Sequence, residues 1–263
     1  MRIQLIAARF SVCAFVVALA VSLTAAFGTR LGFWRFEEGF EILYPGVAIG
    51  FAAAISGAVW LAMALRNNDS KGWRAGFAGL IGAVALLYFP LSAEWRSMNA
   101  PPIHDISTDT GDAPKFEALL ALRKDASNGP EYDGSKRVMI DGKLTTVAEL
   151  QKLAYPDIIP LGKLLNPRGD PKIHPKTILF WRAFEAAKHM GWRIVTFDEK
   201  AGRIEATDTS LWFGFTDDIV VRVEKAGALG ARLDIRSKSR IGTPDYGRNA
   251  ARVRAYLDYV KSL

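Results

Sequence analysis

Three long stretches without any charged residue occupy most of the first 93 residues of this 263-residue chain. They cover residues 10–29, 42–65 and 75–93. A helix needs about 17–25 apolar residues to cross the hydrocarbon core of a bilayer, and each stretch has that length. Because a buried helix of a soluble protein seldom stays uncharged for so long, we expect three transmembrane helices and a membrane domain over residues 1–96.

The first stretch also fits a cleaved signal peptide. Arg2 and Arg9 precede it, and Thr24-Ala25-Ala26 resembles a weak cleavage site. We favour a retained helix, because the stretch is long for the apolar part of a signal peptide and two further apolar stretches follow it.

The basic residues between the stretches predict the orientation in the membrane, because cytoplasmic loops are enriched in Lys and Arg. If all three stretches span, the N-terminal end and the loop at 66–74 share one side and carry five basic residues, against three on the other side. The chain is therefore expected to be a multi-pass protein of the inner membrane of a Gram-negative cell, with a cytoplasmic N-terminus and a periplasmic C-terminal domain. The five are Arg2, Arg9, Arg66, Lys71 and Arg74, and the three are Arg30, Arg35 and Arg96.

Small residues recur in the second and third stretches, where they allow helix backbones to approach closely. Two interpretations stay open, namely packing of the three helices within one chain and association between copies. No charged residue lies within a stretch, which argues against an ion or proton path and hence against a transporter. The glycines are Gly46, Gly50, Gly57, Gly76, Gly79 and Gly82.

The residues from Ser97 onwards have the composition of a water-soluble domain, which we expect over residues 97–263. The single cysteine, Cys13, falls in the first apolar stretch, so this domain has no disulfide and no thiolate metal site. The formal net charge is +7, and we attribute it to loop Lys and Arg residues. The expected partner is the lipid bilayer, whereas nucleic acid is not expected for a domain outside the cytoplasm.

Residue periodicity predicts that this part is an α+β domain, with a four-stranded antiparallel sheet and two helices packed on one face. In the third and fourth strands apolar residues alternate with charged ones, as expected for a sheet with one covered face. Residues 103–114 are predicted to be extended, residues 116–124 and 147–154 to form short helices, and residues 128–142 and 165–175 to form loops. The two long helices are expected over 177–190 and 245–261, the latter with Asp245 as N-cap, and the strands over 192–197, 203–209, 219–224 and 231–237.

Several short motifs of the domain occur in a distinctive order. They are Ile103-His104-Asp105-Ile106-Ser107-Thr108-Asp109, Ala154-Tyr155-Pro156-Asp157-Ile158, Arg203-Ile204-Glu205-Ala206-Thr207, Gly214-Phe215-Thr216-Asp217-Asp218 and Asp234-Ile235-Arg236-Ser237-Lys238-Ser239-Arg240. Roughly residues 101–263 resemble the bacterial and plastid family known as domain of unknown function 1499, and residues 134–147 look like an insertion relative to its shorter pattern. The resemblance implies a domain that is often membrane-tethered or exported, and it implies no reaction.

The best candidate site is an Arg- and Asp-rich corner formed by the last two strands, the turn after them and the start of the last helix. Arg side chains bind carboxylates and phosphates through paired hydrogen bonds, so this corner is a candidate site for an anionic small molecule or lipid headgroup. The alternative is an internal Arg–Asp lattice that fixes the strand-to-helix corner. The candidate ligand residues are Arg222, Arg236, Ser237, Ser239, Arg240, Asn249 and Arg252, and the structural or partner acids are Asp217, Asp218, Asp234 and Asp245.

Two functional hypotheses follow. The first is a membrane-anchored binding or scaffolding module that holds an anionic ligand or docks an envelope protein. The second is an envelope hydrolase acting on a lipid or cell-wall substrate, which requires a pocket where His104 or the pair Asp217 and Asp218 lies close to the serines Ser237 and Ser239. We favour the first hypothesis, because the sequence has no nucleophile elbow, phosphate loop or dinucleotide fingerprint. We assign no catalytic residue and no cofactor. We also assign no metal, because the spacing of His104, Asp105, Asp109 and Asp112 does not match a calcium loop.

Overall fold

The computed structural model describes residues 2–140, 142–162, 174–227 and 230–263. By their contacts the residues form two compact units. The first unit holds Met1–Met98 and Ser210–Gly214, and the second holds Asn99–Thr209 and Phe215–Leu263.

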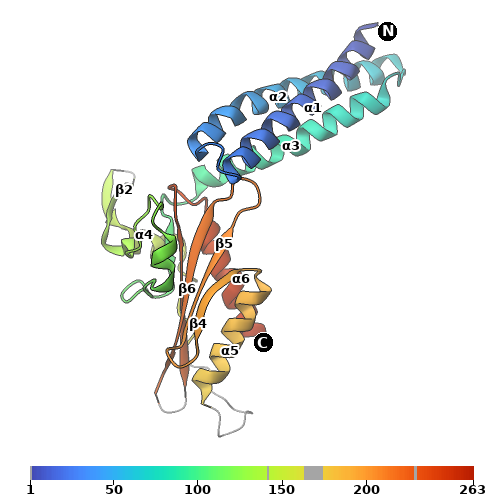
Figure 1. The fold of residues 1–263 in the computed structure, drawn as a ribbon. Coiled ribbons are helices and arrows are strands. Elements are labelled where there is room, and N and C mark those ends of the chain that lie inside the picture. The colour runs from blue at the N-terminus through green and yellow to red at the C-terminus, as the bar shows by residue number, and fades with distance from the viewer. Residues whose placement is uncertain (1, 141, 163–173, 228–229) are drawn as a thin grey trace. The chain divides into compact units, whose positions relative to one another are not determined.

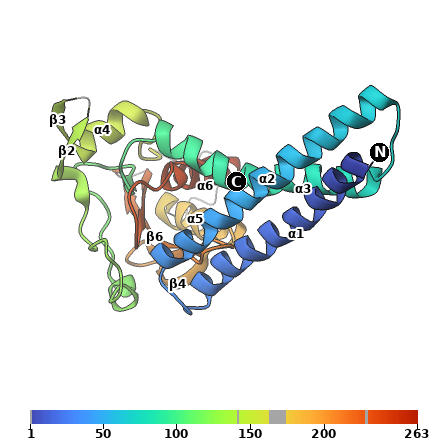
Figure 2. The ribbon, with the colours of Figure 1, turned by 90° about the horizontal axis from the view of Figure 1, so that it is seen from above.

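Three long helices make up most of the first unit: α1 (Arg2–Arg30), α2 (Phe36–Asn67) and α3 (Trp73–Asn99). Within the described part of the chain, these three are long and apolar enough to cross a membrane. Figure 1 and Figure 2 both show them packed lengthwise against one another. The expectation of a multi-pass membrane protein is confirmed at this level.

Glycines allow these helices to approach one another closely. A Cβ atom on Gly79 of α3 would lie only 2.3 Å from Ser11 Oγ of α1, and one on Gly76 would lie 2.2 Å from the ring of Trp60 in α2. The hydroxyl of Ser11 also donates a hydrogen bond to the carbonyl of Ala53 in α2, at 2.8 Å. This arrangement supports the interpretation that the small residues pack the helices of one chain.

An antiparallel sheet is the centre of the second unit, with five strands among the described residues in the order β1-β7-β6-β5-β4. Strands β4 to β7 follow one another in sequence and in space, and β1 pairs with the free edge of β7. The strands are β1 (Asp105–Ser107), β4 (Arg193–Asp198), β5 (Arg203–Thr209), β6 (Thr216–Lys225) and β7 (Ala231–Ser239).

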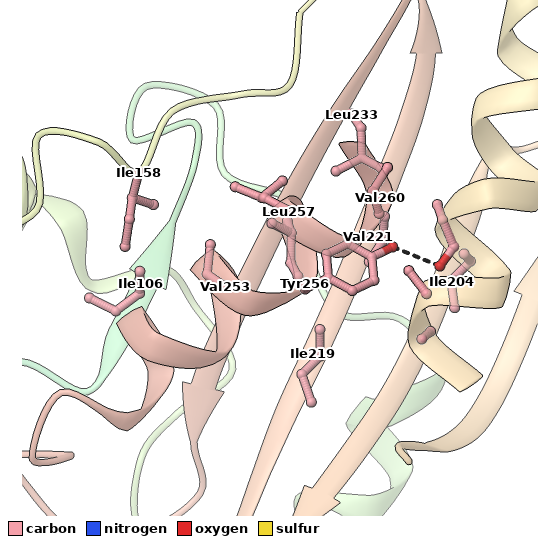
Figure 3. Packing of buried hydrophobic residues seen from close by; sticks show 14 of the residues in the cluster. Ile106, Ile158, Ile204, Ile219, Val221, Leu233, Val253, Tyr256, Leu257 and Val260 are labelled. Carbon is pink, nitrogen blue, oxygen red and sulfur yellow. Dashed lines mark hydrogen bonds between the residues drawn. The ribbon is translucent and has the colours of Figure 1, made fainter. Parts of the chain in front are cut away.

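Helices α5 (Pro175–His189) and α6 (Arg248–Ser262) cover one face of this sheet, as Figure 1 shows. Val253 and Leu257 of α6 are buried in one core with sheet residues such as Val221 (Figure 3). Tyr256 is fully buried in that core because its hydroxyl donates a hydrogen bond to the carbonyl of Ala183 in α5, at 2.8 Å (Figure 3). The expected sheet face with two helices is confirmed.

The opposite face of the sheet is covered by residues 109–133, which we call the covering segment. Phe116 and Leu119 pack against Val220 of β6. The buried carboxylate of Glu205 accepts hydrogen bonds from the backbone amides of Glu117 and Leu119, at 3.0 and 2.9 Å. The covering segment contains the 3₁₀ helix η1 (Ala118–Leu122) and leads into the 3₁₀ helix η2 (Asp133–Ser135). Strands β2 (Arg137–Ile140) and β3 (Lys143–Thr146) and helix α4 (Val147–Ala154) follow, and α4 buries Val147 and Leu150 in the core shared with α5 and α6.

The α+β fold class predicted from the sequence is confirmed, but the sheet has a fifth strand. Residues 105–107 lie in the segment expected to be merely extended, and they form β1 because β7 leaves an edge with free backbone groups. A three-residue strand carries too little alternation to be recognised by periodicity.

Three local predictions differ from the structure or lie outside it. The predicted loop 128–142 contains η2 and β2, because Gly142, with φ 76°, closes a hairpin that pairs β2 with β3. The helix expected over 116–124 is the short 3₁₀ helix η1. Most of the predicted loop 165–175 lies outside the described residues.

Candidate functional site

The candidate residues divide between the two faces of the sheet. Side chains alternate along β7, so Arg236 lies on the face covered by the covering segment, while Ser237 lies on the opposite face, toward α6. The single Arg- and Asp-rich corner expected from the sequence is therefore divided into two networks, one on each face of the sheet. We call them the outer-face network and the helix-face network. The outer-face network comprises Asp105, Arg123, Asp218, Arg222, Asp234, Arg236, Lys238 and Arg240, and the helix-face network comprises Asp208, Asp217, Ser237, Ser239, Asn249 and Arg252.

Arg236 is the centre of the outer-face network and is fully buried. Its Nε and Nη2 atoms donate hydrogen bonds to the two carboxylate oxygens of Asp105, at 2.8 and 2.9 Å. Its Nη2 atom also donates to the carbonyls of Pro130 and Glu131, and its guanidinium lies 4.6 Å from the ring centroid of Phe116. Such extensive pairing is what a buried charge requires, and it ties the covering segment to the sheet.

Asp218 of β6 is also fully buried and lies between two arginines. Arg240 donates from Nη2 and Nε to its two oxygens, at 2.8 and 3.0 Å, and Arg123 donates from Nη1. Burial lowers the pKa of Arg123, while the carboxylate of Asp218 opposes that effect. Arg123 was not among the residues predicted from the sequence, because it lies far from Asp218 along the chain, in a segment without periodicity.

Arg222 lies at the solvent-exposed edge of the outer-face network. It donates hydrogen bonds to the carboxylates of Asp112 and Asp234, at 2.8 and 3.3 Å. Next to it, Arg232 donates to Asp109 at 2.5 Å. Burial favours the neutral form of Asp109, but backbone amide hydrogen bonds and the guanidinium of Arg232 outweigh it and lower the pKa of Asp109.

Arg252 of α6 is the centre of the helix-face network. Its Nη2 atom donates to Asp217 and Asp208, both at 2.6 Å, and its Nη1 atom donates to Ser237 and Asn249, at 3.0 and 2.6 Å. Burial alone would lower the pKa of Arg252, but the carboxylates of Asp217 and Asp208 outweigh it and raise that pKa. This network fixes α6 on the sheet.

The start of α6 completes the helix-face network. The hydroxyl of Ser237 donates to Asn249 Oδ1 at 2.6 Å, and Asn249 Nδ2 donates to Ser239 Oγ at 2.9 Å. The N-cap of α6 is Gly247 and not Asp245 as predicted, but the Asp245 carboxylate still accepts hydrogen bonds from the amides of Gly247 and Asn249. Burial raises the pKa of Asp245, with those amide hydrogen bonds opposing the effect.

His104 connects a hydroxyl group to a carboxylate. Its Nδ1 atom lies 2.7 Å from Thr243 Oγ1, and its Nε2 atom lies 3.0 Å from Asp133 Oδ2. Burial alone would raise the pKa of Asp133, but the hydrogen bond from His104 and the charge of Lys238, 3.1 Å away, lower it to about 2. Thr243 and Asp133 were not among the residues predicted from the sequence, because nothing in their spacing relates them to His104.

The remaining histidines and a small hollow of the domain are separate from the two networks. Among the described residues, no group of three or more His, Cys, Asp or Glu side chains is placed to hold a metal ion. His174 caps α5 by accepting a hydrogen bond from the amide of Lys176, and His189 stacks on Tyr259. A hollow of about 190 Å³ beside η1, β4 and β5 is lined by residues such as Thr196, none of them in the candidate set.

Each candidate arginine already has a carboxylate partner in the domain. The shortest Arg–carboxylate distances are 2.8 Å for Arg222, Arg236 and Arg240, and 2.6 Å for Arg252. An anion bound to these arginines would therefore compete with the domain's own carboxylates. The networks act as cross-links between the sheet, the covering segment and α6, and the candidate ligand set stays a prediction.

These observations define a class of protein: a multi-pass membrane protein whose α+β domain contains a buried Arg–Asp salt-bridge network. Comparison with known protein families matches residues 105–260 to the family described as Protein of unknown function (DUF1499). The chain belongs to this family, which confirms the resemblance seen in its motifs. A search of curated proteins gave no match.

Proposed function

We propose that this chain is a membrane-anchored protein of the cell envelope whose α+β domain is a binding or scaffolding module. The three apolar helices anchor it in the inner membrane. The excess of Lys and Arg at the N-terminal end and in the α2–α3 loop supports a cytoplasmic N-terminus and a periplasmic domain.

Reporter fusions test this orientation. Alkaline phosphatase, which is active only when exported, is expected to be active when it is fused after Leu263. It is expected to be inactive when it is fused in the α2–α3 loop at Asp69. The reverse pattern would place the domain in the cytoplasm and contradict the proposal.

The observation that carries the module is a group of exposed apolar side chains on one lobe of the domain, formed by β2, β3, α4 and residues 155–159. Leu153 and Ile159 are 82% and 61% exposed, and Met139 and Leu144 are 63% and 57% exposed. Met139 and Leu144 are paired across the β2–β3 hairpin, and several exposed apolar side chains on one lobe are typical of a surface that binds a partner. Because residues 134–147 look like an insertion in the family pattern, we expect this lobe to bind an envelope protein specific to this chain.

Charged networks give this lobe a rigid support. Lys238 of β7 lies 3.1 Å from the carboxylate of Asp133, in η2 shortly before β2, and 3.2 Å from the carboxylate of Asp105 in β1. Gln151 of α4 exchanges hydrogen bonds with the backbone of Ser107 in β1, at 3.0 and 2.7 Å. The lobe is therefore joined to the sheet edge through buried polar contacts, as a docking surface of fixed shape requires.

Site-specific photocrosslinking in cells tests the module. A photoreactive residue in place of Leu153 in the full chain is expected to give an adduct with an envelope protein. The matched control at Lys200, in the turn between β4 and β5, is expected to give none. The double variant Met139→Asp, Leu144→Asp changes only exposed side chains and is expected to abolish the adduct.

Two outcomes would contradict the proposal that this lobe is a binding module. The first is the absence of any adduct specific to position 153. The second is an adduct that persists in the double variant while the domain stays folded.

A second candidate function is an envelope hydrolase acting on a lipid or cell-wall substrate, and the His104 arrangement favours it. Thr243 is exposed, its hydroxyl reaches the imidazole of His104, and the carboxylate of Asp133 accepts from the opposite nitrogen. A hydroxyl, a histidine and a carboxylate in this order form the arrangement that activates nucleophiles in hydrolases. Lys238 partly neutralises Asp133, which weakens the arrangement as a catalytic one.

Covalent labelling distinguishes the two functions. A hydrolase predicts that a fluorophosphonate or β-lactone probe labels the full-length protein at Thr243, and that Thr243→Ala and His104→Ala both abolish the label. A binding module predicts no label at Thr243. Labelling at Ser210 and Ser262, which lie outside the His104 arrangement, measures the non-specific reaction of the probe.

A further inference from the structure

The turn between β5 and β6 carries three consecutive large apolar residues, Leu211, Trp212 and Phe213. Turns between antiparallel strands are usually built from Gly, Asn, Asp, Ser and Pro. Leu211 is 66% exposed and Trp212 is 42% exposed. Phe213 is half-buried, with its ring 5.0 Å from that of Phe40. Exposed apolar residues such as Leu211 and Trp212 at the tip of a hairpin require a physical reason, because they cost solubility and contribute nothing to the core of the sheet.

The contacts of this turn show that it lies beside the ends of the apolar helices. Residues Ser210–Gly214 group with the three apolar helices in the first unit. Within that unit, the Trp212 ring lies 6.0 Å from the ring of Phe27 and 6.2 Å from that of Phe89. Arg30, at the end of α1, donates a hydrogen bond to the carbonyl of Ser210 at 2.6 Å.

Membrane topology places these helix ends on one side of the bilayer. If α1, α2 and α3 each cross once, the end of α1 and the end of α3 reach the same membrane face, and the domain that follows α3 lies on that face. Trp is enriched at the level of the lipid headgroups, where its ring has one apolar and one polar environment. Arg30 offers a positive charge at the same level, suited to anionic headgroups.

We propose that Leu211, Trp212 and Phe213 form a membrane-contact tip that inserts into the headgroup region of the bilayer on the side of the folded domain. The tip gives the domain a second attachment to the membrane besides the end of α3. The partner is the lipid surface itself. The inference depends on the membrane-spanning helices and is independent of the lobe that the proposed function invokes.

Fluorescence of the full-length protein in vesicles tests the tip. Cys13 is the single cysteine, so Leu211→Cys in a Cys13→Ala background takes one environment-sensitive nitrobenzoxadiazole label. In vesicles of phosphatidylethanolamine and phosphatidylglycerol, we expect blue-shifted emission. We also expect stronger quenching by lipids with a nitroxide near the headgroup than by lipids with a nitroxide deep in the acyl chain.

The matched control is Lys200→Cys in the same background, because the β4–β5 turn lies at the other end of the antiparallel strands. At that position we expect no quenching by either lipid. Equal quenching at both positions would overturn the proposal. So would a label at position 211 that is blue-shifted but not quenched by lipid, since protein and not lipid would then cover the tip.

Discussion

Replacing Asp218 with Ala is predicted to destabilise the domain by about 3–5 kcal/mol, as is typical when one partner of a buried ion pair is removed. Asp218 is fully buried and is the carboxylate that both Arg123 and Arg240 contact. After the substitution, Arg240 can turn toward solvent because it is partly exposed. Arg123 cannot, so its buried guanidinium keeps only backbone carbonyl partners such as that of Asn128.

Urea unfolding of the full-length protein in detergent, followed by near-ultraviolet circular dichroism, measures this loss. The matched control is Asp157→Ala, which removes an ion pair with Arg254 on the surface at 2.5 Å. Exposed pairs contribute about 0–1 kcal/mol, so the control is expected to be nearly neutral. The double variant Arg123→Met, Asp218→Leu removes both buried charges and is expected to recover most of the stability, because apolar replacements of buried pairs are often neutral.

The reasoning would be refuted if Asp218→Ala cost no more than Asp157→Ala. It would also be refuted if the double variant were as unstable as the single one, because the unpaired charge would then not be the cause.

Three further predictions concern other parts of the molecule. The pKa of Asp133 is lowered from its ordinary 3.8 to about 2. Its pairing therefore stabilises the fold by about 2 kcal/mol above pH 4, and this stabilisation is lost as the pH falls from 4 to 2. Asp133→Asn should flatten that part of the curve of unfolding free energy against pH, measured by denaturant titrations. Gly79→Leu should disrupt the contact with Ser11 and lower the melting temperature of the helices in a thermal scan, whereas Ala78→Leu on the exposed side should not. Thr146→Ala removes the capping box of α4 and should cost about 1 kcal/mol, seen as faster amide exchange in α4 with unchanged exchange in α6.

Helices and central strands of this chain were predictable from the sequence because their signals are local. Uncharged stretches of membrane-spanning length identified α1, α2 and α3, and alternation along β6 and β7 identified the sheet face that α5 and α6 cover. The short strand β1 was not predictable. Its three residues gain strand structure from pairing with β7, which lies more than 120 residues later in the chain.

The candidate site was predictable only in part. The alternation along β6 and β7 correctly placed Arg222, Asp234 and Arg236 on one face. It could not identify the carboxylates of Asp105 and Asp112 as their partners, because Asp105 lies in the three-residue strand β1 and Asp112 in the irregular covering segment, and neither leaves a periodic signal. The same limit explains why Thr243 and Asp133 were not associated with His104, since only the folded chain brings their three segments together.

The division of one corner into two networks follows from the same geometry. Ser237 and Arg236 are neighbours in sequence, but a strand turns successive side chains to opposite faces. Ser237 therefore meets Asn249 and Arg252 of α6, while Arg236 meets Asp105.

The most direct test of the account is whether an anion binds to the Arg-rich corner. The urea midpoint of the full-length protein would be measured in inorganic phosphate and in chloride at equal ionic strength. A ligand that binds only the folded state raises its stability with a saturable dependence on concentration. Phosphate also stabilises proteins gradually, without binding, because it is excluded from their surface. Because Arg222, Arg236, Arg240 and Arg252 are held by the domain's own carboxylates, we expect only that gradual rise, equal in the wild type and in arginine variants. A saturable rise in phosphate that disappears in Arg222→Ala or Arg240→Ala would contradict it and would make the corner a ligand site.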